Sequence, residues 1–206
     1  MIASKLKAGC ALCAAAMLLC CAGCGSKKDT GSSAAESSAA ESSAAEDGVH
    51  VIAADEVDAD LAACVKAYFD ALDRKDYDAF LKTLYPPYKE AYHKMLEAEG
   101  VKPEDDFLRM SSRFDEDGYE SWSLTELTLS YYENEESTVE NYFSRYIEGE
   151  YFDEKFAEDC KADCTEMHDV IFSLSALYEG DKEPVTVVDN VGILAVKNKD
   201  GWYVFG

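Results

Sequence analysis

Histidine and carboxylate side chains are the residues of this chain that could carry acid–base chemistry. His168 is the best candidate for a general base, because histidine titrates near neutrality without perturbation, and Asp169 follows it directly. A histidine in such a position more often lies at a surface or strand edge, and this is the interpretation that we favour. Asp70 and Asp73 fall on the polar side of an expected helix, so a catalytic role would require that face to be covered. The sequence contains no complete catalytic motif, which favours a protein that is not an enzyme.

Two short patterns resemble parts of metal sites. His93 and Glu97 stand four residues apart on an expected helix, but no second histidine or third ligand lies near them in the sequence. Residues 115–118 resemble the middle of a calcium loop, yet that alignment puts Arg113 and Leu124 at the positions that require acids. We therefore expect a solvated helix face and a turn, and no metal or other cofactor.

Three cysteines, Cys64, Cys160 and Cys164, belong to the expected folded domain, and three thiols cannot all pair within one chain. If Cys160 and Cys164 lie on a strand, their Cα atoms are about 13 Å apart, too far for a disulfide. A disulfide from Cys64 to one of the other two and a set of buried, unreactive thiols both remain open.

Tyrosine is unusually abundant, with 13 Tyr against 9 Phe. The pairs Tyr88 with Tyr92 and Tyr142 with Tyr146 have helical spacing. Aromatic walls of this kind can line a groove for a sugar or a peptide, whereas helix-spaced aromatics more often belong to a core. Both interpretations remain open.

The helices that must position these residues follow from apolar periodicity and capping signals. Asp76 is an expected N-cap, Gly100 stands where a helix-ending glycine belongs, and Ser137 with Glu140 forms a capping box. We expect helices over 55–73, 76–84, 88–99, 103–114 and 137–148.

Strands are expected in the second half of the domain. Apolar residues alternate over 122–131 and change phase near Glu126, which predicts a β-bulge there. Residues 160–179 are expected as a strand, and 191–197 and 202–205 as a hairpin joined through Asp200-Gly201. Helices followed by a largely antiparallel sheet predict an α+β domain with the N-terminal helices packed on a curved sheet.

The N-terminus has the charge and length of an export signal. Lys5 and Lys7 precede an apolar run from Ala8 to Leu19, which is shorter than the roughly 18 residues that a spanning helix needs. The run ends in Cys21-Ala22-Gly23-Cys24-Gly25-Ser26, which resembles the lipobox of bacterial lipoproteins, with Cys21 where that family prefers leucine. The resemblance implies lipid attachment at Cys24 and a signal peptide over 1–23. Cleavage of an ordinary signal peptide near Ala22-Gly23 is the alternative.

Residues 24–54 are expected to be a linker. Ser-Ser-Ala-Ala-Glu occurs three times over 32–46, and this period of five builds no apolar helix face. About 30 residues of flexible chain have a root-mean-square reach of about 30 Å, enough to hold the domain clear of lipid headgroups.

Charge limits the possible partners. The net charge is −23, which excludes nucleic acid as a direct partner because phosphate binding needs a basic face. Loss of residues 1–23 removes two lysines and no acid, which gives −25. We expect an acidic, solvated surface that anionic lipid repels, with a specific divalent-cation role as the alternative.

Two segments of the expected domain, 55–206, resemble NTF2-like (cystatin-like cone) domains of Gram-positive lipoproteins. These are 65–80, which opens Val-Lys-Ala-Tyr-Phe-Asp, and 196–204, which reads Val-Lys-Asn-Lys-Asp-Gly-Trp-Tyr-Val. The resemblance implies a cone of helices and curved sheet whose open end can hold a small ligand.

These observations lead to one expected function and two alternatives. We expect a lipid-anchored protein on the outer face of the cell membrane, with a non-enzymatic module that binds a small molecule, a peptide or an envelope protein. The alternatives are an acid–base enzyme of the isomerase or dehydratase kind that uses the cone cavity, and a structural accessory of a membrane complex.

Overall fold

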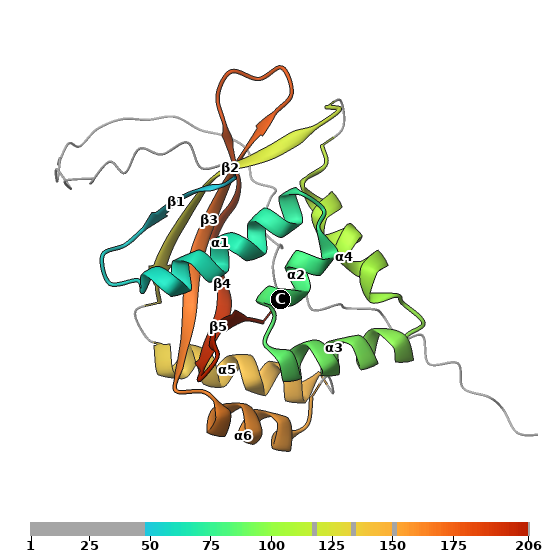
Figure 1. Ribbon diagram of the computed structural model, residues 1–206, viewed down its shortest axis with the longest axis vertical. Helices are drawn as coiled ribbons and strands as arrows, with labels where there is room; N and C mark the ends of the chain where they lie inside the picture. Colours follow the sequence, from blue (N-terminus) through green and yellow to red (C-terminus); the bar gives the residue numbers. More distant parts are fainter. Residues whose placement is uncertain (1–47, 117–118, 133–134, 150–151, 206) are drawn as a thin grey trace, which may run out of the picture. The chain divides into compact units, whose positions relative to one another are not determined.

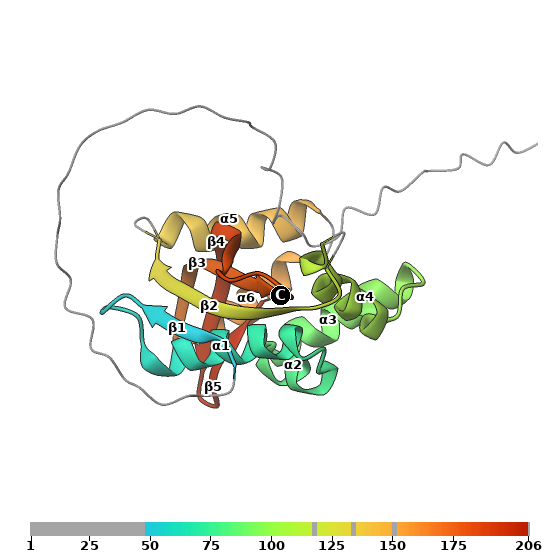
Figure 2. The same cartoon turned by 90° about the horizontal axis from the view of Figure 1, so that it is seen from above.

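The computed structural model describes residues 48–116, 119–132, 135–149 and 152–205. In this part of the chain six α-helices surround a curled five-stranded sheet, as Figures 1 and 2 show. The α+β class and the helices packed on a curved, mostly antiparallel sheet agree with the sequence prediction. No helix in the part of the chain that is described combines the length and the apolar character needed to cross a membrane.

The N-terminal helices form where capping and periodicity predict them. They are α1 (Ala59–Asp73), α2 (Tyr77–Thr83), α3 (Pro86–Ala98) and α4 (Pro103–Ser111), the last followed by a 3₁₀ turn over Ser112–Phe114. Asp58 caps α1 by accepting from the N–H groups of Asp60 and Leu61, and Asp76 caps α2 through the N–H of Ala79. Gly100 follows α3 with φ +77°, a conformation that glycine adopts without strain.

The strands are arranged in the sheet in chain order. They are β1 (His50–Ala53), β2 (Trp122–Tyr131), β3 (Glu166–Tyr178), β4 (Val185–Asn198) and β5 (Gly201–Val204). β1 runs parallel to β2, and the remaining pairs are antiparallel. The register of β2 on β3 shifts between Leu124 and Glu126, which confirms the predicted bulge. The hairpin of β4 and β5 through residues 198–201 is also confirmed.

β1 lies inside the segment 24–54 that the sequence predicts to be linker. His50 pairs with Glu126 and Ala53 with Leu129, so the partner strand is more than 70 residues away in the chain. A strand of four residues with such a distant partner has no local signal, because its hydrogen bonds form only after β2 is in place. The folded part therefore begins before residue 55.

Two sequence predictions in the second half need correction. Residues 154–163 form α6 (Glu154–Asp163), which Asp153 caps through the N–H of Phe156, so the strand predicted from 160 begins only at Glu166. α5 (Glu135–Glu148) begins two residues before Ser137, so Ser137 is not its N-cap. Glutamate favours helix, so the glutamates at 135 and 136 explain why the helix begins before the capping box.

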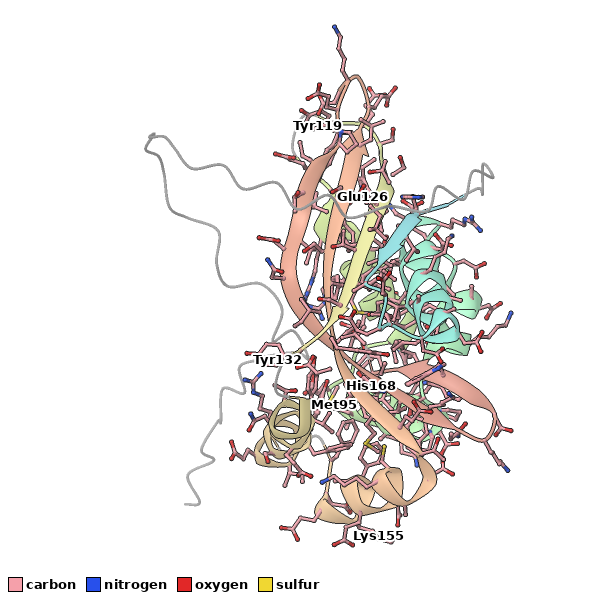
Figure 3. All side chains as sticks on the ribbon, turned by 90° about the vertical axis from the view of Figure 1, so that its left-hand side faces the viewer. Met95, Tyr119, Glu126, Tyr132, Lys155 and His168 are labelled. Carbon is pink, nitrogen blue, oxygen red and sulfur yellow. The ribbon has the colours of Figure 1, made fainter. Side chains whose placement is uncertain are left out.

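The core lies between α1, the other N-terminal helices and the sheet. Phe69 of α1 packs on Phe172 of β3 with ring centroids 4.8 Å apart, and Phe80 of α2 packs on Phe107 of α4 at 4.9 Å. α5 lies on the opposite side of the sheet from α1 (Figures 2 and 3). The sheet is therefore covered by α1 on one side and partly by α5 on the other.

Candidate functional site

The structure gathers charged and aromatic side chains from five elements at one end of the sheet, around His168. We call this cluster the His168 site, and it consists of Asp58 at the start of α1, Tyr131 of β2, Glu166 and His168 of β3, Lys197 of β4 and Trp202 of β5. The strand register explains the gathering, because Glu166 pairs with Lys197 and Lys197 pairs with Trp202 across three adjacent strands. Figure 3 shows where His168 lies relative to the sheet and the helices.

Two aromatic rings flank His168. Its imidazole stacks on Tyr131 with centroids 4.6 Å apart and an interplanar angle of 24°, and it lies 5.5 Å from the Trp202 ring. Trp202 is only 7% exposed and forms the floor of the site. The Tyr131 hydroxyl accepts a hydrogen bond from the Asp58 N–H at 3.3 Å, which joins the site to the first turn of α1.

Lys197 is the central cation of the site. Its Nζ lies 2.9 Å from Glu166 Oε1, 4.0 Å from Asp58 Oδ2 and 5.0 Å from the centroid of the Trp202 ring. The hydrogen bond from Lys197 lowers the pKa of Glu166, and the same bond raises the pKa of Lys197. The backbone N–H of Leu61 is the main cause of a lowered pKa at Asp58, and the backbone N–H of Asp60 and the charge of Lys197 also lower it.

This arrangement can recognise a ligand and can exchange a proton. His168 Nε2 lies 3.7 Å from Glu166 Oε2, and the His168 side chain is 20% exposed, so solvent and a ligand can reach it. A flat ring or aliphatic segment can contact the exposed aromatic edges, while the carboxylates and Lys197 provide charged contacts. The enzyme alternative requires a base inside a cone cavity, whereas the structure puts His168 beside partly exposed ion pairs at the end of the sheet.

Asp169, the sequence neighbour of His168, does not belong to this site. Successive side chains of a strand point to opposite faces, so Asp169 lies on the α5 face while His168 lies on the α1 face. Asp169 is 6% exposed, and a Cβ at Gly192 would stand 2.5 Å from its Oδ1. Tyr142 of α5 donates to the Gly192 carbonyl at 2.8 Å. Burial is the main cause of the raised pKa of Tyr142, and the nearby charge of Asp169 raises it further.

The tyrosines considered as a groove are largely part of the core. Tyr88 is 1% and Tyr92 7% exposed, and their rings stack 5.8 Å apart. Tyr92 donates to the buried Asp106, and Tyr88 packs on Phe205 with centroids 4.6 Å apart. For this pair the structure supports the core interpretation.

Tyr142 and Tyr146 of α5 are half-buried. The Tyr146 ring packs on Phe152 with centroids 5.1 Å apart, and Tyr142 bonds the Gly192 carbonyl as described above. These contacts join α5 to the body of the domain.

Asp70 and Asp73 hold the sheet edge on α1. Asp70 accepts from the Val49 N–H at 3.0 Å and pairs with Lys66 at 2.6 Å, while Asp73 accepts from the Leu124 N–H at 2.9 Å. Burial raises the pKa of Asp73. The sheet does cover the polar side of α1, but these carboxylates satisfy backbone donors of β2 and of the residue before β1.

The residues of the two patterns that resemble metal sites have other contacts. His93 Nε2 lies 3.2 Å from the Tyr77 hydroxyl, and burial lowers the pKa of His93. Asp115 accepts from the Trp122 indole N–H at 2.7 Å, while 117–118 lie outside the described residues. Among the residues that are described, no group of three or more His, Cys, Asp or Glu side chains could hold a metal ion.

The three domain cysteines carry free thiols. Cys64 donates to the Trp202 carbonyl at 3.3 Å, beneath the His168 site. Cys160 lies on α6 and Cys164 is its C-cap, so the distance predicted for a strand does not apply to this pair. Cys24 lies outside the described residues.

The sequence pattern identifies His168 but not its partners. It includes Lys197 and Trp202 only in the hairpin motif, and Tyr131 and Glu166 only as strand positions. The available signal was the hairpin register, which places Lys197 opposite Trp202.

A comparison of this chain with protein-family models, curated proteins and solved structures gives no match.

Proposed function

We propose that this chain is an extracytoplasmic lipoprotein, anchored through lipid at Cys24, whose NTF2-like domain is a non-enzymatic module that binds an envelope protein or peptide with a basic surface. The observation that carries the proposal is the packing of the interior by the domain's own aromatic side chains. Ligand contacts are then made on the outer surface, where the His168 site combines rings and charges.

The packing argument rests on four large side chains with about 1% exposure. These are Tyr85, Tyr88, Phe80 and Phe107, which come from three N-terminal helices and the residue before α3. Phe80 packs on Phe107 among the helices, Tyr85 packs on Tyr203 of β5, and Tyr88 packs on Phe205. A protein or peptide partner needs no internal cavity, so this packing favours it over a small molecule.

Charge supports the basic partner. The chain carries 42 acidic and 19 basic residues. A strong net charge speeds association with an oppositely charged partner and opposes association with a like-charged one. The resulting binding weakens as salt is added, because screening shortens the range of the attraction.

The proposal is tested by photo-crosslinking in intact cells. A photoreactive amino acid replaces Asp60, which is exposed in the first turn of α1 and whose charge acts on Lys197. The matched control position is Lys155 on α6, whose side chain is 73% exposed and which lies well away from His168 in Figure 3. We expect a defined adduct with an envelope protein from position 60, weakened by His168→Ala and by added salt.

The same experiment can contradict the proposal. Adducts that are identical from both positions, or an adduct at position 60 that neither His168→Ala nor salt reduces, exclude the His168 site as the binding surface. Adducts only with components of one stable membrane complex, unaffected by His168→Ala, support the structural-accessory alternative instead.

Acid–base catalysis is the second candidate, and the 3.7 Å separation of His168 Nε2 from Glu166 Oε2 favours it. In that case His168 takes the proton and Glu166 orients the ring. Any turnover by the protein is then lost in His168→Ala while the thermal unfolding midpoint is retained. Activity that survives this substitution rules out His168 as the base.

A further inference from the structure

The end of α6 brings two cysteines into one helical turn. Cys160 is fully buried, and Cys164 is partly exposed as the C-cap. The N–H of Cys164 donates to the carbonyl of Cys160 at 3.0 Å, so the helical path continues to Cys164. Residues four apart on such a path have Cα atoms about 6 Å apart. That separation falls within the range of about 4.4–6.8 Å that a disulfide spans.

The two side chains also act on each other. This interaction is the main cause of a lowered pKa at Cys164 and a raised pKa at Cys160. The hydroxyl of Tyr85 donates to Asp163 Oδ2 at 2.9 Å, and its proximity lowers the pKa of both thiols. The partly exposed thiol of Cys164 is therefore the better nucleophile, and the buried thiol of Cys160 lies next to it.

We propose that Cys160 and Cys164 form a reversible intramolecular disulfide by exchange with a low-molecular-weight disulfide. The Cys164 thiolate attacks one sulfur of the donor, which forms a mixed disulfide and releases one donor thiol. Cys160 then loses its proton to solvent and attacks the Cys164 sulfur, which releases the second donor thiol. Two electrons pass from the protein sulfurs to the donor, and two donor thiols are produced.

Cys64 provides a contrast within the same chain. Burial raises its pKa to about 12, and its thiol donates to the Trp202 carbonyl. At neutral pH such a thiol is protonated and reacts slowly. The substitution Cys64→Ser is therefore a matched control that leaves the exchange unchanged.

The test uses a trypsin site between the two cysteines. Cleavage after Lys155, Lys161 and Lys182 gives the peptides 156–161 and 162–182, which stay together only if the disulfide has formed. The full-length protein is incubated with glutathione disulfide, blocked with an alkylating reagent and digested without reductant. We expect the linked pair of peptides by mass spectrometry, in the wild type and in Cys64→Ser alike.

Two cysteine variants and reduction of the oxidised wild type test the disulfide further. Cys164→Ser and Cys160→Ser remove the linked pair, and dithiothreitol returns both peptides to the alkylated, separate form in the wild type. Cys160→Ser retains the attacking thiol, so it stops at the mixed disulfide with glutathione on 162–182. Separate alkylated peptides from the wild type after oxidation, a link to the Cys64 peptide 29–66, or a dimer linked through Cys164 would each overturn the proposal.

Discussion

The charges of the His168 site are individually modest in energy but respond to pH. Lys197 lowers the pKa of Glu166 in the folded protein, so this pair stabilises the fold above the ordinary glutamate pKa of about 4.3, and the stabilisation is lost as pH falls through the lower folded value. Glu166 is 44% exposed, so solvent screening keeps the contribution below about 1 kcal/mol. We expect Glu166→Gln to lower the unfolding free energy by up to that amount at pH 7, and by progressively less as the pH falls below the ordinary glutamate pKa, measured by urea titration.

A control for this prediction is Asp159→Asn, which breaks the Lys155–Asp159 pair, whose side chains are 73% and 65% exposed. Its effect on unfolding should be smaller than that of Glu166→Gln at pH 7. An effect of Glu166→Gln that does not change with pH would show that packing, and not the ion pair, causes the loss.

Gly192 is required by the close approach of Asp169. Because a Cβ at this position would stand 2.5 Å from Asp169 Oδ1, Gly192→Ala must displace a buried carboxylate, and we expect a loss of about 1–3 kcal/mol in urea unfolding. In the background Asp169→Ala the same substitution should cost much less. Equal costs in both backgrounds would contradict the clash as the cause.

At the scale of the elements, the start of α1 joins the helix to the sheet. Asp58 accepts from the N–H groups of Asp60 and Leu61, and its own N–H donates to Tyr131. We expect Asp58→Ala to destabilise the domain by about 1 kcal/mol in thermal or urea unfolding, since an N-cap side chain is lost. Asp58→Asn keeps the cap and should restore most of that stability. If both variants lose the same amount, the charge facing Lys197 matters more than the cap.

The elements themselves were predictable where their signals are local. Each of these signals lies within or next to the element that it shapes. They are the caps Asp76 and Gly100, the phase change near Glu126 and the Asp200-Gly201 turn. β1 and α6 were missed, because β1 depends on pairing with β2, and α6 is a short helix with two buried residues, Ala157 and Cys160. The strand predicted from residue 160 also puts Cys160 about 13 Å from Cys164, whereas the structure puts the two within one helical turn.

For the whole molecule, the prediction with the clearest readout concerns Cys24. If this cysteine carries the lipid anchor, Cys24→Ser should move the protein from the membrane fraction to the medium, because two acyl chains suffice for stable attachment and none remain. Immunoblots of fractionated cells measure the change, with Cys64→Ser as the control that stays at the membrane. Retention of the Cys24→Ser protein at the membrane would contradict lipid attachment at this residue.

The sequence by itself determined the α+β class, most helix ends and the acidic character, because periodicity, caps, turns and charge are properties of neighbouring residues. Only the tertiary structure decided which side chains meet. Tyr131 and Trp202 reach His168 from strands far away in the chain, whereas the adjacent Asp169 points to the other face. The physical reason is that strand pairing brings distant residues within contact, while pleating separates neighbours.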